Sequence, residues 1–283
     1  MDGMKKRIFT IIFCAILPIL ASAQAQIVTR KMKFEDFTEK TTKVVLTGNP
    51  LFDTSFKEEI KNNWRISPYE FCSLNEFNKL KEDQDYYFLI LLKNQSRKEA
   101  CPGIEMLSVL KGGPEAKKGI ANMLEVVGMP FRAADFPSGR EVTFLPALLD
   151  VMQDQVLASM EKDYDAYGGL STNNTRLASS KSKVIVLADT DLTKEAANVV
   201  SDEKGKVKIA DEETVDELIT KRTPDTLVGY VVSPEDETEG FYCYKMLIDC
   251  ETHQIYYYKK HRMSKKDGRG FLPEDIKKFQ LIK

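Results

Sequence analysis

The fold is decided within residues 183–232, where three short apolar stretches are separated by polar, helix-compatible segments: KVIVL (183–187), VKI (207–209) and LVGYVV (227–232). Short apolar runs rich in β-branched residues predict strands, and the continuous runs are typical of strands covered on both faces. A short helix fits 193–199, and Asp211 is placed to cap a second helix that buries Val215 and Leu218. The order strand, helix, strand, helix, strand predicts an α/β fold.

The elements that follow complete one unit, and a similar series precedes it. After the third strand we expect a hairpin from 241–249 and 254–263, then a helix opened by Pro273. The first half predicts strands near 43–47, 69–72, 86–92, 104–110 and 124–131, and a long helix over 144–160, where Pro146 would lie in the first turn. We expect Ser55 and Glu58 to cap its first helix, and Ser73 and Glu76 its second.

Both halves therefore predict a βαβαβ unit, a hairpin and a helix, in the same order. The expected organisation is a signal peptide at 1–23, a first α/β lobe at 24–166 ending in the long helix, a linker at 167–182 and a second lobe at 183–283. Each lobe should hold a mixed sheet with helices packed on it. The alternative is one large sheet interrupted by a surface loop.

The second half resembles a family of envelope domains on four segments: the 184–187 strand, the 209–211 step into the helix with Val215 and Leu218, the 225–229 step, and 247–255. The last segment is similar to a strand–Asp-x-x-Thr-Gly–strand hairpin, with His253 where Gly is usual. The family includes the curli-secretion lipoprotein and activator lipoproteins of penicillin-binding proteins, with an anticodon-binding-like fold. The resemblance implies an adaptor or assembly role. The whole chain also resembles a family of exported Bacteroidota proteins, through Trp64 and the strand at 67–71.

The N-terminus has the pattern of a secretory signal. Lys5, Lys6 and Arg7 precede an apolar run from 8 to 21, and Ala21-Ser22-Ala23 fits cleavage after Ala23, with Ala25 as the alternative. The rival interpretation is an uncleaved anchor, but the run is shorter than the roughly 20 residues that span a bilayer. The mature chain is therefore expected in the periplasm or secreted, with no span after signal cleavage.

Charge and side-chain chemistry argue against nucleic-acid binding, a zinc site and some of the possible disulfides. Lys and Arg number 41 against 43 for Asp and Glu, a balance that gives no footprint for nucleic acid. His253 and His261 are the only histidines, and with Cys250 they lie too far apart along a hairpin to share a zinc ion. Cys243 and Cys250 cannot pair within one strand, whereas Cys72 with Cys101 is possible and free thiols are an alternative. No cofactor, metal or catalytic constellation is predicted.

The best sequence candidates for binding are Tyr256 and Tyr258. Alternation along the strand places both on one face of the sheet and Tyr257 on the other. If the face with Tyr256 and Tyr258 is exposed, these aromatic side chains would suit a protein or glycan contact; packing under a helix is the alternative. Two hypotheses follow. The first is a non-catalytic envelope protein that binds another envelope protein. The second is a small-ligand receptor or hydrolase with a site between the lobes, which a polar cleft with convergent carboxylates or histidines would favour.

Overall fold

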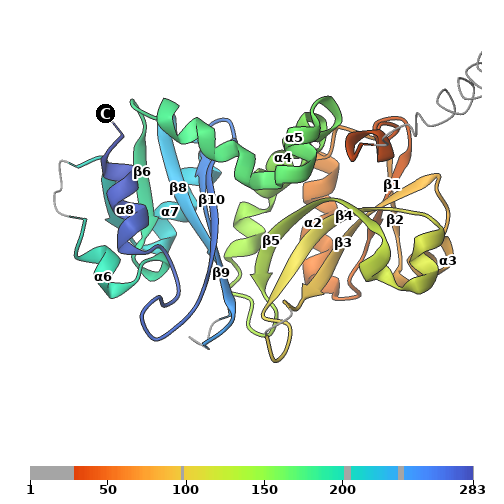
Figure 1. The fold of residues 1–283 in the computed structure, drawn as a ribbon, viewed down its shortest axis with the longest axis horizontal. Coiled ribbons are helices and arrows are strands. Elements are labelled where there is room, and N and C mark those ends of the chain that lie inside the picture. Colours follow the sequence, from red (N-terminus) through yellow and green to blue (C-terminus); the bar gives the residue numbers. More distant parts are fainter. Residues whose placement is uncertain (1–28, 97–98, 201–204, 235–238, 283) are drawn as a thin grey trace, which may run out of the picture.

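The computed structural model describes residues 29–96, 99–200, 205–234 and 239–282, so the expected signal peptide lies outside the described residues. Two mixed five-stranded sheets stand side by side with helices packed on them, which confirms the α/β class. The helix α4 (Arg140–Glu161) passes between them (Figure 1). No helix within the described ranges combines the length and hydropathy needed to cross a bilayer.

The two sheets have the same topology. The first has the order β2-β1-β3-β4-β5 and the second β10-β9-β8-β6-β7, which is the same order read from the opposite edge. In each sheet the first three strands are mutually parallel, and the last two form an antiparallel hairpin. The bounds are β1 (Thr41–Val45), β2 (Tyr69–Cys72), β3 (Tyr86–Asn94), β4 (Ile104–Lys111), β5 (Leu124–Ala133), β6 (Val184–Ala188), β7 (Val207–Ala210), β8 (Thr226–Val232), β9 (Tyr242–Asp249) and β10 (Ile255–Arg262).

The helices also correspond between the lobes. In the first lobe, α2 (Pro50–Asn63) and α4 cover one face of the sheet, and α3 (Leu74–Leu80) covers the other. In the second lobe, α6 (Lys194–Ala197) and α8 (Pro273–Gln280) share one face, and α7 (Glu212–Thr220) lies on the other. Short 3-10 segments lie at η1 (Lys31–Lys33), η2 (Pro114–Lys118), η3 (Ile120–Asn122), η4 (Gly169–Ser179) and η5 (Asp189–Asp191).

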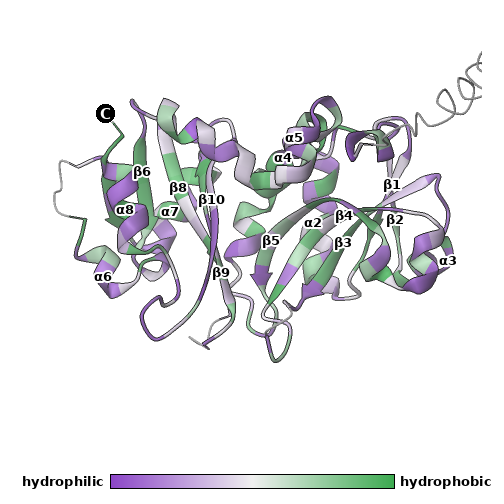
Figure 2. Cartoon of the chain, viewed as in Figure 1, coloured by the Kyte–Doolittle hydropathy of each residue, from purple (hydrophilic) through white to green (hydrophobic). Residues whose placement is uncertain are grey.

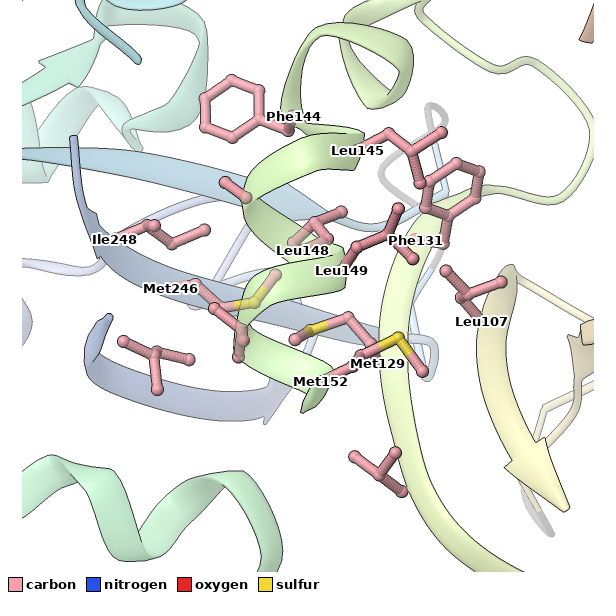
Figure 3. Close-up of a cluster of buried hydrophobic side chains, with 14 of the residues drawn as sticks. Leu107, Met129, Phe131, Phe144, Leu145, Leu148, Leu149, Met152, Met246 and Ile248 are labelled. Atoms are coloured by element: carbon pink, nitrogen blue, oxygen red, sulfur yellow. The ribbon is translucent and has the colours of Figure 1, made fainter. Parts of the chain in front are cut away.

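One hydrophobic core joins the lobes through α4. Figure 3 shows Phe144, Leu148 and Met152 of α4 between strands of the two sheets. The Phe144 ring stacks on Tyr230 of β8 with ring centroids 4.4 Å apart, and the Tyr230 hydroxyl donates to the Phe131 carbonyl of β5 at 2.7 Å. Figure 2 shows hydrophobic residues along the strands and mainly hydrophilic ones on the outer helices α3 and α8. Since the same buried cluster takes in residues of both sheets, the lobes form one packed body.

Two expected helix starts were wrong. The helix α2 begins at Pro50 rather than near Ser55, because the Asn49 side chain accepts hydrogen bonds from the Leu51 and Phe52 amides. The helix α4 begins at Arg140, four residues before the expected start, so Pro146 lies inside it rather than in its first turn. Proline supplies no N–H to the Val142 carbonyl one turn earlier.

The expected linker at 167–182 is a packed part of the fold. It forms the end of α5 (Asp163–Gly168) and the segment η4, where Leu170 and Leu177 are buried. The Asn174 side chain donates to the Tyr258 carbonyl at 2.9 Å and accepts from the Tyr258 amide at 2.6 Å. Asn174 thus satisfies the backbone of the edge strand β10, which would otherwise be open to another strand.

Candidate functional site

A cavity of about 480 Å³, lined by both polar and apolar residues, opens where the two lobes meet. Its walls come from α2 and α4 of the first lobe, and from α7 and the β9–β10 turn of the second. The lining residues are Glu59, Asn62, Asn63, Val142, Thr143, Pro146, Ala147, Ile219, Thr220, Arg222 and His253. We call this cavity the His253 pocket. Its volume lies within the range of small-molecule sites, about 300–1,000 Å³.

His253 occupies a backbone conformation that few side chains adopt. The Asp249 carboxylate accepts from the Glu251 and Thr252 amides at 3.1 and 2.9 Å, and this closes the β9–β10 turn. His253 then takes φ +58°. For a residue other than glycine the left-handed region costs roughly 1–2 kcal/mol. The chain thus holds an imidazole where glycine would be easier, and outliers of this kind gather at functional sites.

The ring of His253 is buried and is oriented by the other lobe. Its Nδ1 lies 2.8 Å from Oδ2 of Asp150 on α4, and Arg65 donates to the other carboxylate oxygen at 2.6 Å. Although burial alone raises the pKa of Asp150, the His253 hydrogen bond and the Arg65 charge outweigh it and hold that pKa below its ordinary value. An ionised Asp150 accepts only, so Nδ1 carries a proton and Nε2 is the nitrogen left for a ligand.

The other walls carry one acidic and one basic group. Glu59 of α2 accepts from Asn63 at 2.8 Å, and burial raises the pKa of its carboxyl group. Arg222, just after α7, donates to the Glu251 carbonyl at 3.4 Å and lies 3.9 Å from Asp150. Within the described residues Glu59 forms no ion pair with a basic side chain. The pocket therefore presents an unneutralised carboxylate from one lobe and a guanidinium from the other.

A second polar cluster ties the lobes together farther along the interface. Arg140, the first residue of α4, contacts Asp191 at 3.2 Å, Asp216 at 3.0 Å and Glu212 at 3.5 Å, all from the second lobe. These carboxylates raise the pKa of Arg140 despite its burial, which keeps the guanidinium charged. A smaller cavity of about 340 Å³ adjoins this cluster. With three carboxylates around one buried guanidinium, the cluster works as an inter-lobe clamp.

The tyrosines singled out in the sequence do not share a face. A β-bulge interrupts the pairing between Ile255 and Tyr257, so alternation fails there. Tyr258 packs into the inter-lobe core beside Tyr244, whereas Tyr256 packs on the opposite face under the α8 side of the sheet. Both are partly buried rather than exposed. Their role as binding residues stays a prediction, without the shared surface that motivated it.

The remaining candidates are separated. His261 Nε2 lies 2.9 Å from the Gly268 carbonyl, in a different environment from His253. In the described part of the chain no three His, Cys, Asp or Glu side chains come together as a metal site. The four cysteines of the described chain are free thiols, and burial raises the pKa of Cys72 and Cys243 to about 11. Buried thiols of high pKa are poor nucleophiles.

The sequence analysis offered a site between the lobes as one hypothesis but did not assign His253 to it. The signal present in the sequence was the departure itself: an imidazole at the glycine position of an Asp-x-x-Thr-Gly turn. No protein-family model, curated protein or solved structure matches the chain. The interpretation of the site therefore rests on its geometry.

Proposed function

We propose that the protein is an exported receptor that binds a small polar ligand in the His253 pocket. The observation that carries the proposal is the position of the His253 imidazole. Its Nδ1 is held by Asp150 of the other lobe, which leaves Nε2 for a ligand, and its backbone adopts an unfavourable left-handed conformation. Buried polar groups are normally satisfied, and pockets with a few convergent polar groups are the usual ligand sites. The signal-like N-terminus would deliver the mature chain to the periplasm or beyond.

The proposal is one of binding rather than hydrolysis. The hydroxyl groups among the lining side chains belong to Thr143 and Thr220. The Thr220 hydroxyl donates to the Asp216 carbonyl at 2.7 Å, and within the described residues no hydrogen bond joins the Thr143 hydroxyl to His253 or Glu59. A nucleophile needs a base within hydrogen-bond reach. The shared core also ties the lobes together, so the ligand would enter a preformed pocket rather than close two hinged lobes.

Capture of a ligand from small-molecule extract tests the proposal. The mature protein is incubated with extract, washed, denatured, and the released molecules are identified by mass spectrometry. Wild type should retain at least one compound that His253→Asn does not, because asparagine tolerates the left-handed backbone but lacks Nε2. Thr252→Asn, at an exposed position of the same turn, is the matched control and should retain it. Equal retention by all three proteins would contradict the proposal.

A second candidate function is binding to another envelope protein, as the resemblance to adaptor domains implies. One observation favours it: exposed large hydrophobic side chains lie on η1, α5 and the end of α4. They are Met32 of η1, Leu157 of α4, and Tyr164 and Tyr167 of α5, with 43%, 40%, 70% and 68% of their surface exposed. The Lys31 amide donates to Asp163 at 3.0 Å, which holds η1 against α5 (Figure 1). Exposed tyrosines of this kind are enriched in protein interfaces.

Crosslinking in living cells distinguishes this second candidate. A partner recovered reproducibly with the tagged protein should be lost when Tyr164 and Tyr167 both become serine. The same double change at Tyr256 and Tyr258 tests the sequence prediction, after a check that this variant still folds. Recovery of the tagged protein alone would leave the receptor proposal as the better account.

A further inference from the structure

We infer that the ligand of the His253 pocket is a zwitterion, a free amino acid or the end of a short peptide. This inference rests on the receptor proposal above and adds the ligand class. It comes from the charges and hydrogen-bonding groups that line the pocket, which include both acceptors and a donor.

The acceptors fit an ammonium group. A primary ammonium presents three N–H donors. Three residues of the lining, Glu59, His253 and Val142, each carry an acceptor: a carboxylate, the ring nitrogen Nε2 and a backbone carbonyl. The Glu59 carboxylate has only the Asn63 amide as its side-chain donor. Nε2 of His253 is the ring nitrogen that does not contact Asp150. The Val142 carbonyl lacks its usual helical donor because residue 146 is proline, which has no N–H group.

The basic group of the pocket fits a carboxylate. Arg222 belongs to the second lobe, and its side chain is 53% exposed, with the Asp150 carboxylate 3.9 Å away. A guanidinium can hold a carboxylate through two parallel hydrogen bonds. Ala147 and Ile219 also line the pocket and supply an apolar surface for a small side chain. Neutral sugars would leave the Glu59 charge unpaired, and dianions would meet Glu59 directly.

Calorimetric titration of the mature protein tests the ligand class. The probes are glycine, alanine, serine and valine, the dipeptide Ala-Ala, and two single-charge analogues, N-acetylalanine and alanine amide. Glucose and succinate represent the competing classes. We expect saturable binding by at least one amino acid or by the dipeptide, and at least tenfold weaker binding when either charge is removed. Tighter binding of Ala-Ala than of alanine would identify a peptide end as the source, and the reverse a free amino acid.

Matched variants locate the recognition. Glu59→Gln should weaken the zwitterion at least tenfold, whereas Glu58→Gln, at the neighbouring exposed position, should not. Arg222→Gln should do the same, with Lys221→Gln as its control. Circular dichroism of each variant confirms that it is folded. Equal binding of N-acetylalanine and alanine, or an unchanged affinity in Glu59→Gln, would overturn the inference.

The outcomes separate the two proposals. Saturable binding of glucose or succinate alone would overturn the zwitterion and leave the receptor proposal intact. No saturable binding of any probe, together with equal retention of extract compounds by wild type and His253→Asn, would overturn both the zwitterion inference and the receptor proposal.

Discussion

The Asp150 carboxylate receives a hydrogen bond from each lobe, from Arg65 on one side and His253 on the other. Arg65 is largely exposed, so water replaces much of its contribution, whereas the His253 ring is buried. The hydrogen bond to His253 is therefore the one that fixes both the imidazole and the β9–β10 turn.

Asp150→Asn should lower the free energy of unfolding by about 2 kcal/mol at pH 7, the usual contribution of a hydrogen bond to a charged group. Urea unfolding followed by circular dichroism measures this change. A loss below about 0.5 kcal/mol, typical of surface substitutions, would show that the pair is not a structural tie.

The same pair makes a prediction about pH. The folded-state pKa of Asp150 lies below its ordinary value of 3.8, so its stabilisation is complete above that value. The stabilisation is lost as pH falls through the lower folded-state pKa. The difference in unfolding free energy between wild type and Asp150→Asn should thus shrink as the pH falls below about 4. A difference that grows below pH 4 would contradict this.

At the scale of elements, local patterns predicted well where local chemistry decides. The capping box of Ser73 and Glu76, the Asp211 cap and the bounds of β2 follow from short-range hydrogen bonds and alternation, and the structure has them as expected. The start of α2 was missed although its cap, Asn49, is local. Other misses involve distant partners: His253 contacts Asp150 of α4, and the Tyr258 backbone contacts Asn174 of η4, which no local pattern encodes.

The segment η4 gives a testable prediction at this scale. Asn174→Ala removes both hydrogen bonds to the Tyr258 backbone, so the amide of Tyr258 should exchange with deuterium at least tenfold faster. Thr175→Ala, whose hydroxyl bonds only within η4, should leave that exchange rate unchanged. Equal protection in both variants would show that apolar packing alone covers the edge of β10.

At the scale of the whole molecule, the matching topologies of the two sheets support the duplication expected from the sequence. The way the lobes pack could not be predicted, because it depends on one helix serving both. The helix α4 corresponds to α8 in the other lobe, yet α4 also covers the α7 face of the second sheet. Dividing the chain into lobes after residue 166 places α4 in the first lobe alone, whereas in the structure α4 packs against both sheets.

This shared core predicts a single unfolding transition. Calorimetry of the mature protein should give one peak whose calorimetric and van't Hoff enthalpies agree, because neither lobe keeps its core without α4. Two separate peaks would show that the lobes fold independently. A soluble, folded fragment of residues 183–283 would contradict the prediction in the same way.

The Arg140 clamp predicts a large effect of one charge. Arg140→Gln leaves the buried Asp191 beside Asp216 and Glu212 without its ion-pair partner, which should cost about 3–5 kcal/mol. Lys221→Gln, which removes an exposed ion pair, should cost less than about 1 kcal/mol. Denaturant titration of both variants measures the contrast, and equal losses would show that the clamp is not a structural tie.

Nuclear magnetic resonance of the imidazole nitrogens tests the central claim most directly, since the chain has only two histidines. Nitrogen-15 labelling of histidine in the mature protein should show His253 with Nδ1 protonated and Nε2 as the free acceptor. Addition of amino acids, short peptides and sugars should shift the His253 Nε2 resonance with at least one class and leave His261 unchanged. A proton fixed on Nε2 with Nδ1 free, or a His253 signal unmoved by every addition, would contradict a ligand site between the lobes.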